Sequence, residues 1–140
     1  MRDTGAPGEP VIEATDLGLT FDTNDGPVHA LTGVTLRIEK GDFVSFIGPS
    51  GCGKTTFLRC VAALEHPTSG TLTVNGMSPD AARQRRAYGY VFQAAGLYPW
   101  RTIAGNVKLP LEIMGFSRAE QDERVRNVLS LVDLDGFGKK

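Results

Sequence analysis

A glycine-rich segment in the first half of the chain has the residue types that bind phosphate. The segment reads Gly48-Pro49-Ser50-Gly51-Cys52-Gly53-Lys54-Thr55. Its spacing matches G-x-x-x-x-G-K-[ST], the Walker A or phosphate-loop pattern. A polyphosphate needs many hydrogen-bond donors at short range, and backbone N–H groups reach it only where side chains leave room. The three glycines of the segment leave that room.

The pattern gives each residue of the loop an expected role towards Mg-ATP. The Lys54 ammonium is expected between the β- and γ-phosphates, the Thr55 hydroxyl on Mg²⁺, and the Thr56 hydroxyl on the α-phosphate. Free N–H groups in the first turn of the next helix add a positive dipole end. The predicted ATP-binding residues are Gly48, Pro49, Ser50, Gly51, Cys52, Gly53, Lys54, Thr55 and Thr56. The alternative is a glycine-rich turn whose lysine faces solvent, with Cys52 as an inert small residue.

The elements around this loop fit its chemistry. Residues 43–47 are apolar at both even and odd positions apart from Ser45, which predicts a strand buried on both faces. Residues 54–64 lack Gly and Pro and predict a helix, which Pro67-Thr68-Ser69-Gly70 ends. The loop therefore stands between a strand and a helix, which is the context that phosphate binding requires.

Other strands are predicted on both sides of the loop. Residues 11–21 and 34–38 have apolar side chains at mostly two-residue spacing and are separated by a break at 22–27, which predicts antiparallel strands with one wet face. A short strand at 71–74 ends in the hairpin signal Asn75-Gly76. Residues 88–92 predict a second buried strand.

Two helices are predicted in the last third of the chain. Thr102 can cap a helix that reaches about Met114, although Pro110 should end or kink it. Ser117 and Glu120 form a capping box for the second helix. The apolar face expected for this helix consists of Val125, Val128, Leu129 and Val132. Residues 1–10, rich in Gly, Pro and charge, predict a disordered terminus.

Composition limits the possible partners. The chain has 140 residues, 41% of them hydrophobic, as in an ordinary globular domain. Its net charge of −1 gives no overall attraction to nucleic acid, and Arg83, Arg85 and Arg86 are expected to be a solvated face. Cys52 and Cys60 do not suggest a disulfide framework, so a reducing cytoplasm is expected. His29 and His66 lack metal-ligand spacing.

Beyond the loop, residues 11–138 resemble the nucleotide-binding domains of ABC transporters. The segments that carry this resemblance are Val28-His-Ala-Leu-Thr-Gly-Val, Gly41-Asp-Phe-Val, Pro67-Thr-Ser-Gly70, Tyr90-Val-Phe-Gln93 and Leu97-Tyr-Pro-Trp-Arg-Thr102, together with the loop itself. The tetrapeptide Pro-Trp-Arg-Thr after Phe-Gln, followed by Asn106 and Leu109-Pro-Leu, resembles the nitrate, sulfonate and taurine importer branch.

The resemblance implies roles for residues outside the loop. Gln93 matches the Q-loop glutamine, which contacts Mg²⁺ and the attacking water, so the implied catalytic residues are Lys54 and Gln93. Phe21 matches the aromatic residue that stacks on adenine; its alternative is an ordinary core strand residue. Leu97, Tyr98 and Trp100 lie where the family meets its membrane subunit, or else they pack within the helical lobe.

The resemblance also implies a function and partners. The expected protein is an ATP-binding subunit that couples ATP binding and hydrolysis to solute import, peripheral on the cytoplasmic face of the membrane. Its expected partners are a transmembrane permease subunit, a second nucleotide-binding domain in a homodimer and, indirectly, a periplasmic or extracellular solute-binding protein, with no nucleic acid. The expected fold is an α/β P-loop domain with an antiparallel lobe (about 11–40 and 71–76), a partial parallel core and the start of a helical lobe after Gln93.

Several catalytic motifs of the family do not occur in these residues. There is no L-S-G-G-Q signature and no Walker B run ending in Asp-Glu, and Leu131-Val132-Asp133 is rejected as one because Ser130 interrupts the run. The 140 residues are therefore expected to be an amino-terminal part, unable to hydrolyse ATP alone and prone to aggregate. Two alternatives stay open: a non-hydrolysing nucleotide-binding module, and a small P-loop kinase or GTPase.

Overall fold

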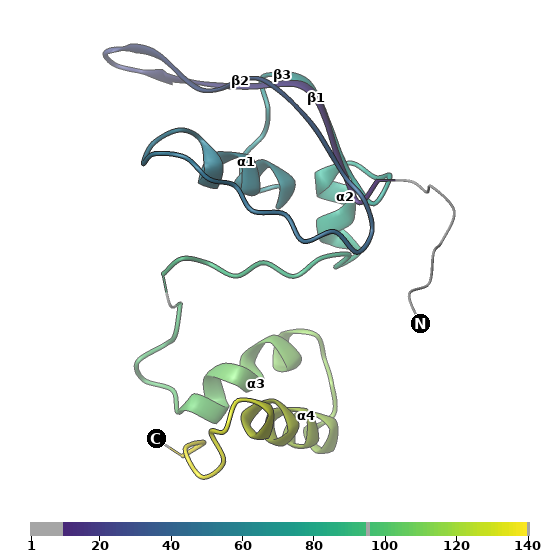
Figure 1. Ribbon diagram of the computed structural model, residues 1–140. Helices are drawn as coiled ribbons and strands as arrows, with labels where there is room; N and C mark the ends of the chain where they lie inside the picture. The colour runs from purple at the N-terminus through teal and green to yellow at the C-terminus, as the bar shows by residue number, and fades with distance from the viewer. Residues whose placement is uncertain (1–9, 95, 140) are drawn as a thin grey trace. The chain divides into compact units, whose positions relative to one another are not determined.

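The computed structural model describes residues 10–94 and 96–139 of the chain (Figure 1). The described residues divide into two compact units, the first up to Tyr90 and the second from Val91 onwards. The disordered terminus predicted at 1–10 lies, apart from Pro10, outside the described residues. Among the described residues, no helix combines the length and the apolar character needed to cross a membrane.

The first unit is built on a three-stranded antiparallel sheet. Its strands are β1 (Ile12–Thr23), β2 (Gly26–Ile38) and β3 (Ser69–Val74), in the order β2-β1-β3. The antiparallel pairing that the sequence predicted is confirmed, but β2 begins at Gly26 and not near 34. The hairpin between β1 and β2 is therefore longer than the apolar alternation alone indicated.

A bulge in β1 explains why its apolar residues are irregularly spaced. Ala14 pairs with Leu36 and Leu17 with Val34, so β1 uses three steps where β2 uses two. The extra residue is accommodated at Asp16, which has a φ of 49° and donates its backbone N–H to the Thr35 hydroxyl at 2.9 Å. The bulge turns both Ala14 and Leu17 into the core.

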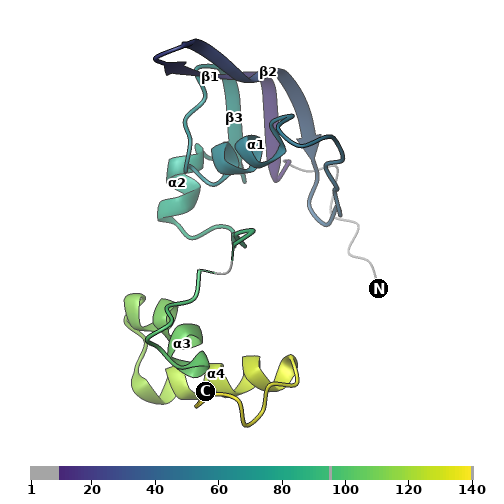
Figure 2. The ribbon, with the colours of Figure 1, turned by 90° about the vertical axis from the view of Figure 1, so that its left-hand side faces the viewer.

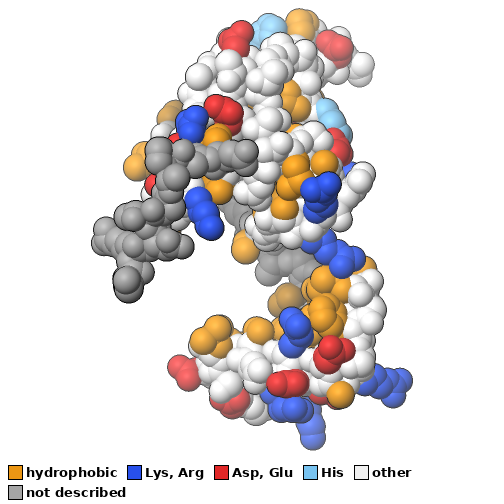
Figure 3. Space-filling view, turned by 90° about the vertical axis from the view of Figure 1, so that its right-hand side faces the viewer, with side chains coloured by type: hydrophobic (Ala, Val, Ile, Leu, Met, Phe, Trp, Pro, Cys, Tyr) orange, Lys and Arg blue, Asp and Glu red, His pale blue; other side chains and the backbone are white. Residues whose placement is uncertain are grey.

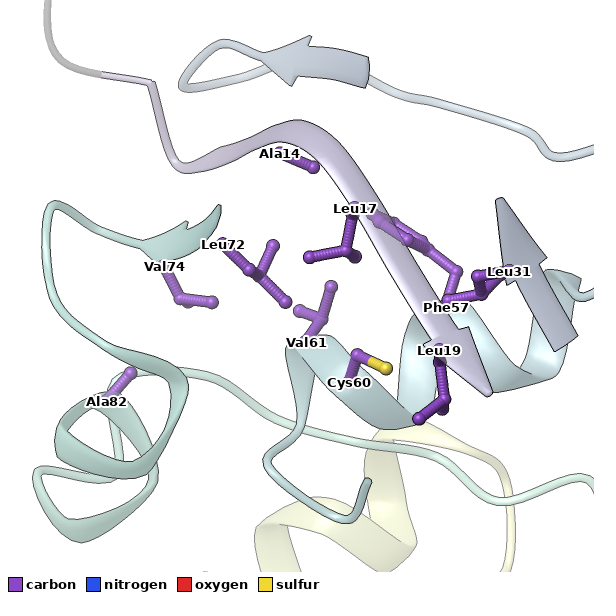
Figure 4. Packing of buried hydrophobic residues seen from close by; sticks show 10 residues of the cluster. All are labelled: Ala14, Leu17, Leu19, Leu31, Phe57, Cys60, Val61, Leu72, Val74 and Ala82. Atoms are coloured by element: carbon purple, nitrogen blue, oxygen red, sulfur yellow. The ribbon is translucent and has the colours of Figure 1, made fainter. Parts of the chain in front are cut away.

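Helix α1 (Lys54–Val61) covers one face of this sheet (Figure 2). Phe57, Cys60 and Val61, spaced three and four residues apart, point into the core because they share one face of the helix. Figure 4 shows these side chains among those of the sheet, with the Leu17 side chain extending from β1 into the core. The helix ends three residues before the predicted Leu64.

A second helix of this unit was not predicted. Helix α2 (Pro79–Gln84) begins after Ser78, whose hydroxyl accepts the Ala81 N–H at 3.3 Å, and it buries only Ala82. Ser78 before Pro79 is a helix-start signal, since proline suits the first helical position. This start signal could have been found in the sequence, but so short a helix has no apolar periodicity to support the prediction.

The two predicted buried strands do not form. Residues 43–47 and 88–92 belong to no strand, and Phe43, Ile47 and Val91 are 96%, 95% and 96% exposed. A strand needs a neighbouring strand that shares its hydrogen bonds, and the sheet among the described residues pairs only β1 with β2 and β3. Tyr88 is held differently: its hydroxyl donates to the Ala62 carbonyl at 2.7 Å.

The second unit is a pair of packed helices, α3 (Ile103–Ile113) and α4 (Arg118–Leu131). The caps are as predicted: Thr102 accepts the Gly105 N–H, and Ser117 and Glu120 form the capping box. Pro110 does not end α3, which continues to Ile113. Figure 3 shows basic and acidic side chains mixed with exposed apolar ones over the visible face of this unit.

The buried face of α4 differs from the predicted one. Gln121, Val125 and Leu129, four residues apart, are its buried residues, whereas Val128 and Val132 are exposed. The cost of burying the Gln121 amide is offset by its hydrogen bond to the Phe116 carbonyl at 2.7 Å. Leu131 lies in the helix, which supports its rejection as part of a Walker B strand.

Candidate functional site

The predicted phosphate loop leads directly into α1. Gly51 and Gly53 have φ angles of 81° and 93°, a left-handed conformation that glycine adopts without strain. Gly53 is the N-cap of α1, and no side chain caps this end of the helix. The N–H groups of the first turn therefore remain without an intrahelical or side-chain acceptor, as an anion site requires.

Lys54 folds back over the loop. Its Nζ donates to the carbonyl oxygens of Gly48 and Pro49, both at 2.7 Å, and lies 3.3 Å from the Cys52 sulfur. The alternative of a plain glycine-rich turn required a lysine that extends into solvent. Lys54 does not do so. The positive charge and the uncapped helix end are thus gathered in one loop.

Space is limited at two glycines of the loop, by backbone at Gly53 and by a movable side chain at Gly48. A β-carbon at Gly53 would lie 2.7 Å from the Ala30 carbonyl oxygen, and one at Gly48 would lie 2.8 Å from the Cys52 sulfur. At Gly51, in contrast, nothing lies within 4 Å. The loop is therefore packed against β2 on one side and open at Gly51.

The remaining loop residues lie around this cradle. The Cys52 N–H reaches the Pro49 carbonyl at 3.4 Å, and Ser50, Cys52 and Thr55 are exposed while Thr56 is half-buried. The hydroxyls expected to serve Mg²⁺ and the α-phosphate are thus in the first turn of α1. No group of three or more His, Cys, Asp or Glu side chains that could hold a metal ion occurs within residues 10–94 and 96–139.

Phe21 and Gln93 lie outside the loop, and their roles stay predictions. Phe21 is partly exposed near the end of β1, directly opposite Val28 of β2, so it is not the buried core residue of the alternative interpretation. Gln93 is exposed and belongs to the second unit, whereas the loop belongs to the first. The joint role of Gln93 and Thr55 at Mg²⁺ therefore stays a prediction.

The aromatic segment at 97–102 is exposed. Leu97 and Trp100 are 63% and 76% exposed, and the Tyr98 and Trp100 rings lie 4.9 Å apart between centroids. The Leu97 and Trp100 side chains are therefore not packed inside the helical unit, as the alternative interpretation required. Sequence reasoning missed the side chain that holds this segment, Asn106, because its hydrogen bonds depend on the folded turn.

The pKa shifts lie away from the loop. Burial raises the pKa of the Cys60 thiol, with a further contribution from Glu65. The hydrogen bond from Ser117 lowers the pKa of Glu120, and the hydrogen bond from Lys108 lowers that of Asp122. The two histidines are surface residues: His29 contacts the Thr20 hydroxyl, and His66 contacts Asp80.

Comparison with known proteins decides the family. A family model described as ABC transporter matches residues 31–140, which is most of the chain. The chain belongs to the ABC transporter family. Its similarity to solved ABC cassettes extends to the fold: the dimeric cassette MJ0796 bound to ADP and Pi superimposes with a TM-score of 0.77 and 31% identity, covering 91% of this chain and 60% of that one.

Curated ABC proteins of known role are similar along most of the chain. The methionine import ATP-binding protein MetN of Bordetella pertussis is 40% identical over 131 residues, covering 89% of this chain and 36% of that protein. The carnitine transport ATP-binding protein OpuCA of Listeria monocytogenes is 42% identical over 115 residues, covering 80% and 29%. The chain thus spans about a third of the length of these relatives.

Proposed function

We propose that the protein is an ATP-binding subunit that couples ATP binding and hydrolysis to solute import. The observation that carries this proposal is the position of Lys54, whose ammonium lies on the Gly48 and Pro49 carbonyls beside the uncapped start of α1. Phosphate oxygens would replace those carbonyls as acceptors of the Lys54 hydrogen bonds, and they bind an ammonium more strongly because they are charged.

The loop residues fit a triphosphate. Uncapped N–H groups and the glycine backbone supply donors, and Gly51 leaves open space beside them. Mg²⁺ bound with ATP supplies charge neutralisation at the phosphates. The Thr55 hydroxyl and the Gln93 amide would hold the ion, and Phe21 would stack on adenine. A relative of this fold bound to ADP and Pi supports the choice of nucleotide.

The transport role rests on the relatives. MetN and OpuCA are named for methionine import and carnitine transport, which supports an importer with a small organic solute. The motif from Pro99 to Thr102 favours the nitrate, sulfonate and taurine branch instead, so the solute class within importers is the finer part of the proposal. Uptake assays with each solute class in cells lacking the gene would separate these candidates.

The proposed assembly places the protein on the cytoplasmic face of the membrane. Its partners would be a permease, contacted through Leu97, Tyr98 and Trp100, and a second copy of the ATP-binding domain, with a solute-binding protein acting through the permease. Exposed aromatic side chains suit such an interface. The dimeric state of the MJ0796 cassette supports the homodimer.

Hydrolysis needs groups that residues 1–140 do not contain. Without a Walker B carboxylate the attacking water lacks a base, so these residues are proposed to bind ATP without turning it over. The alternative of a non-hydrolysing nucleotide-binding module differs from an active transporter subunit only in its lack of ATP hydrolysis. Measuring phosphate release by residues 1–140 tests this part of the proposal, since turnover would contradict the absence of a base.

Calorimetry of Mg-ATP binding tests the central claim. Lys54→Ala removes charge-assisted hydrogen bonds worth about 1.5–3 kcal/mol each, so its affinity should fall at least about tenfold. Lys40→Ala, at an exposed lysine in the turn after β2, is the control and should bind as the wild type does. Equal affinities for all three proteins would contradict the phosphate-loop assignment.

A further inference from the structure

The Asn106 side chain makes several hydrogen bonds that none of the roles described above explains. Its Oδ1 accepts the Tyr98 N–H at 2.7 Å. Its Nδ2 contacts three carbonyl oxygens, those of Tyr98 at 3.1 Å, Arg101 at 3.2 Å and Thr102 at 3.0 Å. An amide has two N–H donors, so these three contacts share them.

This network fixes the orientation of the amide. Exchanging its oxygen and nitrogen would set an NH₂ group against the Tyr98 N–H and an oxygen against three carbonyls, so only one orientation is satisfied. Asn is a weaker helix former than Ala, yet it lies in the first turn of α3. The contacts to residues 98–102 compensate for this local disadvantage.

The residues held in this way are the exposed aromatic ones. The Tyr98 backbone is bound through both its N–H and its carbonyl, and Trp100, 76% exposed, lies against the Tyr98 ring. Arg101 adds a second brace, since its guanidinium donates to the Gly105 carbonyl at 2.8 Å and to the Glu112 carboxylate at 2.9 Å. A large exposed aromatic side chain binds a partner better when its backbone is already ordered.

We infer that Asn106 is a positioning residue that holds Tyr98 and Trp100 in the arrangement that docks on the membrane partner. This inference rests on the proposed function for the docking surface itself. Asn106 does not touch the partner; it acts by keeping residues 98–102 in one conformation before binding. Its loss therefore costs partner affinity without changing nucleotide binding.

Trp100 fluorescence tests the positioning directly, because it is the single tryptophan of the chain. In Asn106→Ala and Asn106→Asp, which lose the donors to the three carbonyls, fluorescence anisotropy should fall and acrylamide quenching should rise. Thr102→Ala is the matched control: it removes the N-cap bond to the Gly105 N–H, weakening α3 without touching Tyr98. Circular dichroism at the same temperature verifies that each variant keeps its helices.

The outcomes of this measurement separate positioning from plain helix stability. The inference is supported if the Trp100 signals change in both Asn106 variants and stay at the wild-type value in Thr102→Ala. Unchanged signals in Asn106→Ala, or equal changes in Thr102→Ala, overturn it. Asn106→Gln, which keeps the amide, should recover part of the wild-type signal.

A double-mutant cycle on the assembled transporter tests the functional part. Trp100→Ala and Asn106→Ala should each weaken binding to the permease about tenfold or more, and the double variant should lose less affinity than the sum of the two single losses. Fully additive losses would show that Asn106 acts elsewhere and overturn the inference. Unchanged binding in Trp100→Ala would instead contradict the proposed docking surface, whatever the fluorescence shows.

Discussion

Gly53 lies against Ala30 so closely that no side chain fits between them: a β-carbon on Gly53 would lie 2.7 Å from the Ala30 carbonyl oxygen. The contact joins the phosphate loop to β2, and through β2 to the sheet that carries Phe21. Backbone faces backbone here, so neither group can turn aside as a flexible side chain would. The placement of the loop therefore depends on glycine at this position.

Gly53→Ala should destabilise the first unit more than Gly51→Ala does. Both glycines have positive φ, so each substitution should cost about 1–2 kcal/mol of strain. Only Gly53→Ala adds a clash with backbone, for which we expect roughly 1–3 kcal/mol more. Urea unfolding of the two variants measures the difference, and equal free energies of unfolding would show that the contact with Ala30 can relax.

Leu17→Ala should be among the most destabilising substitutions in the sheet. Leu17 is fully buried between β1 and α1, and removing a leucine side chain from such a site costs about 2–5 kcal/mol. Val28→Ala, on the exposed part of β2, should change the free energy of unfolding by about 0.5 kcal/mol or less. A loss of unfolding free energy in Leu17→Ala no larger than that in Val28→Ala would contradict the packing that follows from the bulge at Asp16.

Those parts of the structure that depend on nearby residues could be predicted from the sequence. The caps at Thr102 and Ser117 each involve a side chain and a backbone group three residues away, so they do not depend on the rest of the fold. The phosphate loop is likewise continuous in sequence. Its glycine spacing therefore indicates a candidate site without knowledge of the fold.

Features that depend on distant partners could not be predicted in this way. Residues 43–47 have the composition of a buried strand, but a strand exists only where a neighbour accepts its hydrogen bonds. The bulge at Asp16 depends on Thr35 of β2, and the role of Asn106 depends on how residues 98–102 turn. The role of Gln93 stays a prediction, because Gln93 and the phosphate loop belong to different units.

The two thiols should differ strongly in reactivity. Cys52 is exposed in the loop and Cys60 is buried under the sheet, so a disulfide reagent should titrate one thiol in the folded protein and the second only on unfolding. In Cys52→Ser the fast reaction should disappear. A remaining thiol that still reacts at the rate of Cys52 would contradict the burial of Cys60.

Cys60 should also make stability fall at high pH. Its folded pKa is raised by burial above the ordinary value of 9.0, so the unfolded chain releases this proton at lower pH than the folded one. The contribution of Cys60 to stability is therefore complete below pH 9.0 and decreases as the pH rises past it. Cys60→Ala should show a flatter dependence of unfolding free energy on pH in that range.

Glu120 should give the opposite dependence at low pH. The Ser117 hydroxyl and backbone N–H both donate to its carboxylate, which lowers its folded pKa below the ordinary 4.5. The unfolded chain thus takes up the proton first, so this stabilising contribution is complete above pH 4.5 and is lost as the pH falls through the folded pKa. Glu120→Gln keeps an acceptor for the capping box but has no charge to titrate. The stability difference between wild type and Glu120→Gln should accordingly be constant above about pH 5.5, where Glu120 is ionised in both the folded and the unfolded protein. The difference should shrink on acidification. Thermal unfolding in a pH series measures it, and a difference that grows towards low pH would show that the charged capping box does not form.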